Sequence, residues 1–251
     1  MNTFDLTGKV AIVTGSNAGL GAGMAVALAT AGCDIVGVSR ADAGATPTHV
    51  KAAGRRFADV RADLASIAPV EDIVRAAVEA FGRVDVLVNN AGLIRREDAL
   101  DFSEADWDAV MDVNLKSVFF LSQAVARQFV QQQSRGKIIN VASMLSFQGG
   151  IRVASYTASK SGVLGLTRLL ANEWAAHGIN VNAIAPGYMA TANTAALRGD
   201  AQRNEEILSR VPAGRWGTPE DLAGPVVFLA SSASDYVHGH TLAVDGGWLA
   251  R

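Results

Sequence analysis

Lys9-Val-Ala-Ile-Val-Thr-Gly-Ser-Asn-Ala-Gly-Leu-Gly21 is the stretch of sequence that decides the fold. Residues 9–14 form an apolar run typical of a buried strand, residues 15–21 a glycine-rich turn, and residues 22–31 a helix that ends at Gly32. Glycines in such a turn let the backbone bend tightly and let a pyrophosphate approach the amide groups at the start of the helix. The spacing is G-x-x-x-G-x-G, whereas the common dinucleotide fingerprint is G-x-G-x-x-G. The turn therefore indicates a dinucleotide site, although glycine clusters also form ordinary turns.

Apolar runs and amphipathic stretches alternate through the rest of the chain. Strands are predicted at residues 34–39, 56–64, 84–89, 137–142, 179–185 and 241–244. Helices are predicted at residues 70–81, 103–133 and 156–177 and from residue 218 onward, and the polar stretch before residue 204 suits a lid. This alternation predicts an α/β fold, a doubly wound parallel sheet with helices on both faces, in a single domain over residues 1–251.

The composition excludes several classes of protein. Basic and acidic residues nearly balance, 22 against 24, and no basic stripe suits nucleic acid. Cys33 is the single cysteine, so an internal disulfide and a cysteine-based zinc site are excluded, and the four histidines lack metal-ligand spacing. Neither a signal peptide nor a membrane-spanning apolar run is recognisable. We therefore expect a cytoplasmic protein with no metal site and no nucleic-acid or membrane partner.

A tyrosine and a lysine four residues apart form the candidate catalytic pair. Tyr156 and Lys160 would share one face of a helix, and a nearby cation favours the phenolate. Moving the pKa of a tyrosine from about 10 to about 7 needs roughly 4 kcal/mol, much of which one close lysine can supply. Ser143 follows the 137–142 strand, at the edge where open α/β sheets bind ligands. Taken alone, the pair could equally be two neighbours on a solvated helix.

Polar and small residues at the other strand ends are candidates for cofactor binding. The second strand ends in Ser39-Arg40, with no acid for a ribose 2′-OH and with an arginine that can accommodate a 2′-phosphate, which favours NADP. Ala18 supplies no second basic group, so NAD stays open. Asp63 could bond an adenine amine or cap a helix, and residues 90–92 are small enough for a ring to approach. Asn114, a polar residue in apolar spacing, could hold a water, orient Lys160 or bond local backbone.

With these motifs placed, the sequence resembles the short-chain dehydrogenase/reductase family over its full length, and a Rossmann-like sheet is implied. The motifs that carry the resemblance are Thr14-Gly15-x-x-x-Gly19-x-Gly21, Asn89-Asn90-Ala91-Gly92, Asn114, Ser143, Tyr156-x-x-x-Lys160 and Pro186-Gly187. The resemblance implies that Tyr156 is the acid/base, Ser143 orients the carbonyl, Lys160 lowers the tyrosine pKa and holds the ribose, and Asn114 supports a proton relay. It also implies a cofactor site built from Gly15, Asn17, Gly19, Leu20, Gly21, Ser39, Arg40, Asp63, Leu64, Asn90, Ala91, Gly92, Tyr156, Lys160, Pro186, Gly187, Met189 and Thr191.

Within that family, three segments look like the 2-dehydro-3-deoxy-D-gluconate 5-dehydrogenases, also labelled 2-deoxy-D-gluconate 3-dehydrogenases. The segments are residues 92–98, 143–152 and 212–217. The resemblance implies an acidic sugar substrate from uronate breakdown, NAD as cofactor and a homotetramer with its C-terminal residues at a subunit contact. An arginine can grip a carboxylate bidentately, and four lie near the catalytic loops. Candidate substrate residues are Arg95, Ser143, Gln148, Arg152 and Tyr188, with Arg152 favoured and Arg96 and Arg215 also considered. Each of these arginines could instead form an ion pair at the surface or between subunits.

Three other functions compete with this one. The same chemistry could act on a simple sugar, a polyol, a steroid or an acyl thioester. A non-catalytic dinucleotide sensor would not need the serine, tyrosine and lysine together. A nucleotide-binding methyltransferase also begins with a glycine loop, but it gives no reason for those three residues.

Overall fold

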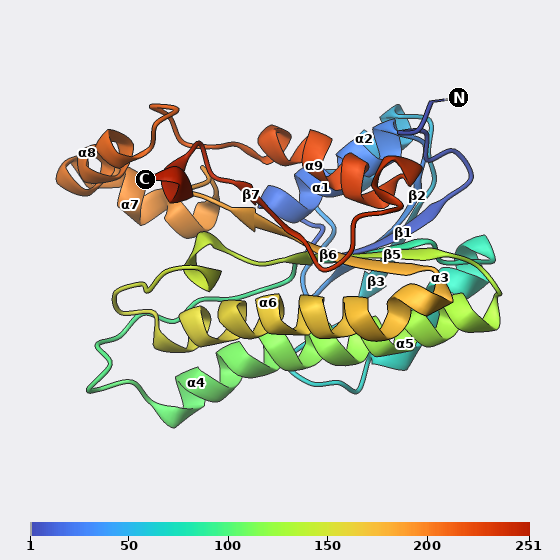
Figure 1. Ribbon diagram of the computed structural model, residues 1–251, viewed down its shortest axis with the longest axis horizontal. Helices are drawn as coiled ribbons and strands as arrows, with labels where there is room; N and C mark the ends of the chain where they lie inside the picture. The colour runs from blue at the N-terminus through green and yellow to red at the C-terminus, as the bar shows by residue number, and fades with distance from the viewer. Residues whose placement is uncertain (1) are drawn as a thin grey trace.

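The computed structural model describes residues 2–251, and a seven-stranded sheet runs through its middle (Figure 1). The strands are β1 (Val10–Thr14), β2 (Asp34–Ser39), β3 (Phe57–Arg61), β4 (Val86–Asn89), β5 (Gly136–Val141), β6 (Ile179–Pro186) and β7 (Thr241–Val244). Their order is β3-β2-β1-β4-β5-β6-β7, and all neighbours are parallel. The predicted doubly wound parallel sheet is therefore confirmed.

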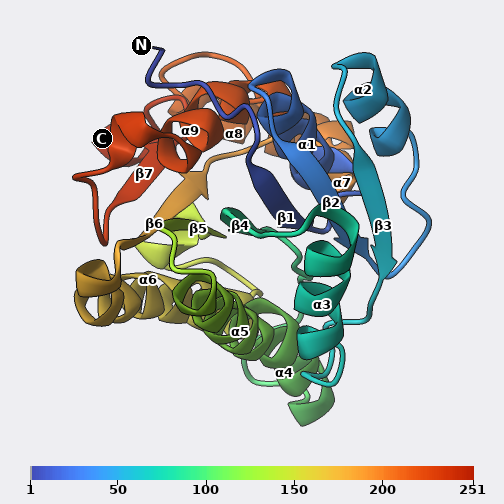
Figure 2. The same ribbon diagram turned by 90° about the vertical axis from the view of Figure 1, so that its right-hand side faces the viewer.

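Helices cover both faces of the sheet because successive strand residues point to opposite sides. In β1, Val10 and Ile12 pack on one face, against α3 (Val70–Phe81), α5 (Ser117–Gln131) and α6 (Ala154–Trp174). Ala11 and Val13 pack on the other face, against α1 (Gly19–Thr30), α2 (Thr46–Ala52) and α9 (Ala223–Ala230). Figure 2 shows these two layers on either side of the strands. Strands buried on both faces explain why the sequence shows unbroken apolar runs.

One predicted helix differs from the structure. The stretch 103–133 is not one regular helix but α4 (Glu104–Met111), a π-helical turn (Asp112–Lys116) and α5. The turn carries Asn114, and π-turns inside α-helices are frequent at functional sites. The helix predicted at 70–81 and its closing residue Gly82 are confirmed, with Gly82 in the left-handed region at φ 80°.

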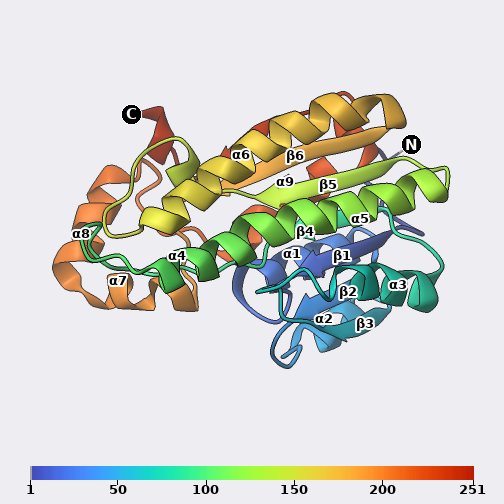
Figure 3. The same cartoon turned by 90° about the horizontal axis from the view of Figure 1, so that it is seen from below.

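The strand ends place the candidate site at one edge of the sheet. The chain reverses its direction of growth between β1 and β4, the topological switch point at which such sheets bind ligands. Beyond β6, α7 (Ala195–Gly199) and α8 (Ala201–Arg210) gather at this same end of the molecule (Figures 1 and 3). Within residues 2–251, the length and apolarity needed to cross a bilayer are not found together in any helix.

Candidate active site

A cavity of about 750 Å³ lies at the carboxyl ends of β1, β4, β5 and β6. Its inner wall consists of the glycine-rich turn after β1, the loop after β4, the segment after β5 and the first turns of α6. Its outer wall consists of residues 187–210, which include α7 and α8, together with Trp248. This volume is in the range of small-molecule and cofactor sites.

The glycine-rich turn is shaped so that its backbone faces the cavity. A Cβ atom on Gly21 would lie 2.2 Å from the carbonyl oxygen of Gly15 and 2.4 Å from Nδ2 of Asn90, so no side chain fits there. Gly15 and Gly19 have φ angles of 65° and 55°, which favour glycine. A Cβ on Gly19 would meet only the side chain of Thr191, at 3.7 Å, across the cavity. The start of α1 therefore presents backbone amides to open space.

Thr14, which sequence reasoning used only as part of a motif, holds the loop after β4 in place. Its Oγ1 accepts hydrogen bonds of 2.9 Å from the backbone N–H groups of Asn90 and Ala91. The side-chain amide of Asn90 donates back to the carbonyl of Thr14 at 2.9 Å. These bonds join β1 and β4 at the switch point and fix the floor of the cavity.

These features suit a dinucleotide. Backbone amides at the N-terminus of a helix bind a pyrophosphate, and the small residues after β4 leave room for a flat ring. Of the residues expected to bind the cofactor, those that line the cavity are Gly15, Asn17, Gly19, Leu20, Asn90, Ala91, Gly92, Tyr156, Lys160, Gly187 and Thr191. These residues together form the part of the cavity that would hold the dinucleotide.

The remaining expected cofactor residues lie outside the lining of the cavity. Ser39 donates its hydroxyl to the carbonyl of Ala41 at 2.9 Å, and Arg40 is exposed. Asp63 is exposed and accepts a hydrogen bond from the backbone N–H of Ala65 at 3.0 Å, which forms a local turn and not the helix cap considered for this residue. Gly21, Leu64, Pro186 and Met189 are also not among the residues that line the cavity.

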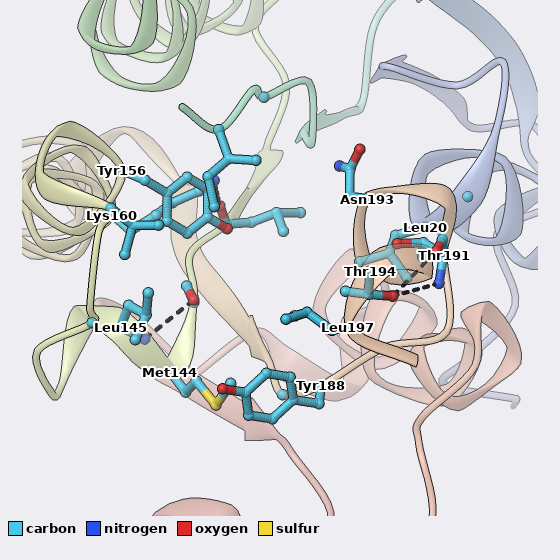
Figure 4. A pocket seen from close by; sticks show the side chains of 18 of the residues that line it. Leu20, Met144, Leu145, Tyr156, Lys160, Tyr188, Thr191, Asn193, Thr194 and Leu197 are labelled. Atoms are coloured by element: carbon cyan, nitrogen blue, oxygen red, sulfur yellow. Dashed lines mark hydrogen bonds between the residues drawn. The ribbon is translucent and has the colours of Figure 1, made fainter. Parts of the chain in front are cut away.

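Ser143, Tyr156 and Lys160 all line the inner wall of the cavity. Figure 4 shows the side chains of Tyr156 and Lys160 next to each other. Ser143 is 7% exposed, and its Oγ accepts a hydrogen bond from the backbone N–H of Leu145 at 3.1 Å. Ser146, which the sequence did not single out, donates its hydroxyl to the carbonyl of Lys160 at 2.6 Å and accepts from the backbone of Ser143 at 3.3 Å. The segment after β5 is thereby attached to α6, so that Ser143 and Tyr156 keep a fixed relation.

The prediction that Lys160 lowers the pKa of Tyr156 is corrected by the geometry. The Lys160 ammonium lies 5.7 Å from the centre of the Tyr156 ring and donates to the carbonyl of Val141 at 2.6 Å. Burial raises the pKa of Tyr156 above its ordinary value, and the hydrogen bond with Ser143 and the charge of Arg96 offset this only in part. Burial also lowers the pKa of Lys160 to about 8.

Within the described residues, Asn114 makes no direct side-chain hydrogen bond to Lys160 or to its own helical turn. Its Oδ1 accepts from the backbone N–H of Leu93, and its Nδ2 donates to the carbonyl of Leu93, both at 2.9 Å. Nδ2 also lies 3.3 Å from Oγ of Ser159, which in turn donates to the carbonyl of Tyr156 at 2.8 Å. Asn114 therefore connects the loop after β4 to the backbone of Tyr156.

The structure does not bring the favoured arginine to the cavity. Arg152 does not line it, because its side chain lies 3.3 Å from Glu97 and its backbone carbonyl accepts from the N–H of Glu97. Arg95 is paired with Asp106 at 3.0 Å and likewise lies outside the lining. Arg215 is paired with Asp221 away from the same cavity. These ion pairs correspond to the alternative that the sequence left open for each arginine.

Three other arginines do line the cavity. Arg96 comes from the loop after β4, and its charge reaches Tyr156. Arg203 and Arg210 come from α8 and were missed, because no sequence spacing relates this helix to the catalytic loops. Gln148 and Tyr188, both expected to contact substrate, also line the cavity. Glu206 is the one carboxylate among the lining residues of the described chain.

Comparisons with known proteins agree with this architecture. Residues 15–249 match a family model described as Enoyl-(Acyl carrier protein) reductase. The chain is 67% identical over 251 residues to a 2-dehydro-3-deoxy-D-gluconate 5-dehydrogenase of Dickeya dadantii, and 66% identical to one of Escherichia coli, covering 100% of this chain and 99% of each relative. A crystal structure from Agrobacterium tumefaciens, of a candidate 2-deoxy-D-gluconate 3-dehydrogenase with bound NADP, shares 56% identity at a TM-score of 0.95, with 100% of both chains covered.

Proposed function

The chain belongs to the short-chain dehydrogenase/reductase family of oxidoreductases, and we propose that its substrate is a deoxy-sugar acid. In this proposal a hydride moves between a nicotinamide dinucleotide and a keto or hydroxyl carbon of a 2-dehydro-3-deoxy-D-gluconate or 2-deoxy-D-gluconate type compound. Residues 1–251 act as one dinucleotide-binding and catalytic domain. Names of full-length relatives at 66–67% identity support this substrate class.

The meeting of Ser143 and Tyr156 in the same cavity as the glycine-rich turn carries this proposal. When bound, the dinucleotide supplies or accepts the hydride, and the protein contributes position and a proton. The Tyr156 hydroxyl gives its proton to the oxygen of the substrate in reduction and takes one in oxidation. The Ser143 hydroxyl orients that oxygen, and Asn114 positions Tyr156 through Ser159.

The charges on the cavity wall support an anionic substrate. Arg96, Arg203, Arg210 and Lys160 line the cavity, whereas Glu206 is the one lining carboxylate in the chain from residue 2 to residue 251. Such an excess of positive charge in a cleft raises the local concentration of anions. A phosphate-bearing dinucleotide and a sugar carboxylate both benefit from it.

The cofactor is assigned as NAD or NADP. Arg40 at the end of β2, without an acid at position 39, favours NADP, and the NADP-bound Agrobacterium relative agrees with this, whereas the resemblance to the deoxy-gluconate dehydrogenases favoured NAD. We further propose a cytoplasmic homotetramer, as the resemblance implies. The C-terminal Trp248, expected at a subunit contact, packs in this chain with Met144, Ile207 and Val211 and is 5% exposed.

Steady-state kinetics with both cofactors test this proposal. The substrates are 2-dehydro-3-deoxy-D-gluconate, 2-deoxy-D-gluconate, a neutral sugar, a polyol and an acyl thioester, and the absorbance of the reduced cofactor is followed. We expect kcat/KM to be highest for a sugar acid. A higher kcat/KM for any neutral compound contradicts the substrate class, and the ratio between the two cofactors decides their preference.

A further inference from the structure

The two arginines of α8 are held in different ways at the outer wall. Nη1 of Arg203 lies 2.7 Å from Oε2 of Glu206, so its charge already has a counter-ion. Arg210 has no carboxylate within 4.0 Å in the described part of the chain. Both line the cavity. Arg210 is therefore the α8 cation whose charge is left for a ligand.

Aromatic and amide groups hold the Arg210 side chain in a defined orientation. Its Cζ lies 4.1 Å from the ring centre of Trp248, a cation–π contact. Its Nη2 donates to Oε1 of Gln148 at 3.5 Å, and Gln148 belongs to the segment that follows Ser143. A guanidinium has five N–H donors in one plane, so this arrangement leaves donors for a bidentate carboxylate. The Arg210 side chain is thus already partly ordered before a ligand binds.

Arg96 and Arg210, the two lining arginines that have no carboxylate partner in the described part of the chain, come from different walls of the cavity. The charge of Arg96 reaches the Tyr156 hydroxyl, at the reacting end. Arg210 lies on α8 at the outer wall, where it contacts Trp248 and Gln148. In the compound for which the relatives are named, the carboxylate is carbon 1 and the oxidised carbon is carbon 5. A substrate whose carbon 5 faces Tyr156 therefore extends its carboxylate away from that hydroxyl.

We propose that Arg210 is the specificity-determining residue that binds the substrate carboxylate, with Trp248 and Gln148 as its positioning residues. The inference rests on the proposed function, since it concerns the far end of the same substrate. Because Arg210 ends α8, the carboxylate also ties this helix to the inner wall through Gln148.

Kinetics on a matched pair of substrates test the role of Arg210. The pair is 2-dehydro-3-deoxy-D-gluconate and its neutral carbon-1 amide, measured with wild type, R210M and R210K. Loss of a charge-assisted hydrogen-bonded pair raises the KM for the acid by about 10- to 100-fold, because such bonds contribute about 1.5–3 kcal/mol. We expect the KM for the amide and both kcat values to change little. R210K recovers part of the acid preference, and W248L loses part of it while W248F keeps it.

R75Q is the matched control, since Arg75 lies on α3 in an exposed ion pair with Asp72. Its ratio of acid to amide KM should equal that of wild type. An unchanged ratio in R210M overturns the proposal, and R210K decides if R210M does not fold. If wild type turns over neither compound, the proposed function fails, and the affinity for D-gluconate then decides for Arg210. Equal Kd values for wild type and R210M overturn its role, and a Kd at least tenfold weaker for R210M supports it.

Discussion

The inner and outer walls of the cavity are built in opposite ways. On the inner wall Ser143 and Lys160 are buried, and Asn114, which bonds to the lining residue Leu93, is buried as well. The side chains of Ser143, Lys160 and Asn114 are bonded to the backbone of Leu145, Val141 and Leu93, respectively. On the outer wall, α8 has Ile207 as its one buried residue, and its arginines are exposed. This difference implies that the residues of proton transfer are held in place by the core of the fold. Substitution of the α8 arginines, by contrast, should change the stability of the protein only little.

The sharpest test of the inner wall is Y156F. Removing the hydroxyl should lower kcat/KM by about 100- to 10,000-fold, because the proton donor and acceptor is lost. Dinucleotide affinity, measured by fluorescence titration, should stay nearly the same. Y236F is the control, since Tyr236 is 99% exposed. Near-normal turnover by Y156F would remove Tyr156 from the proposed mechanism.

A pH series with K160M tests how deeply the inner wall is buried. Burial lowers the pKa of Lys160 in the folded protein to about 8, from its ordinary value of 10.5. Between these values the unfolded chain binds more protons, so stability rises with pH. The unfolding free energy of wild type minus that of K160M should increase by at most about 3 kcal/mol over that window. The unfolding free energy is measured by urea unfolding at each pH. K51M, which removes an exposed lysine, should show the same increase of unfolding free energy with pH as wild type. A pH-independent difference between wild type and K160M would contradict the burial argument.

The unfolding free energies of N114A and N193A compare the two walls, since Asn114 bonds to Leu93 of the inner wall and Asn193 belongs to the outer wall. N114A leaves both backbone groups of Leu93 without their partner and should lower the unfolding free energy by roughly 1–3 kcal/mol. N193A, at an exposed position on the outer wall, should change it by less than about 0.5 kcal/mol. Equal losses for the two variants would abolish the contrast between the walls.

The smallest expected effect is that of R203Q. Arg203 and Glu206 are about half exposed, and exposed ion pairs contribute about 0.2–1 kcal/mol. We therefore expect the KM for the sugar acid to change by less than about fivefold, well below the effect of R210M. A change as large as that of R210M would mean that α8 binds the carboxylate with both arginines.

The sequence predicted what depends on local pattern. Strands buried on both faces read as apolar runs, and Gly82 marks the end of α3 because it adopts a left-handed conformation there. The alternation of these elements placed Ser143 and the glycine-rich turn at one sheet edge, which is why the cavity could be anticipated.

What the sequence could not supply depends on contacts between distant segments. The π-turn at Asn114 accompanies its bonds to Leu93, and no helical spacing reveals such a partner. Arg152 lies between Ser143 and Tyr156 in sequence, yet it adopts φ 61° and faces Glu97. The direction of the Tyr156 pKa shift follows from burial, which only the folded chain determines.

The packing of Trp248 against Arg210 has a consequence for synthesis on the ribosome. Gly15 and Trp248 line the same cavity although they lie near opposite ends of the chain. A nascent chain that has emerged only as far as α9 carries Ser143 and Tyr156 but lacks the aromatic ring that holds Arg210. A chain truncated after α9 would therefore keep the reactive groups of the active site while losing part of its preference for an acid, as expected for W248L.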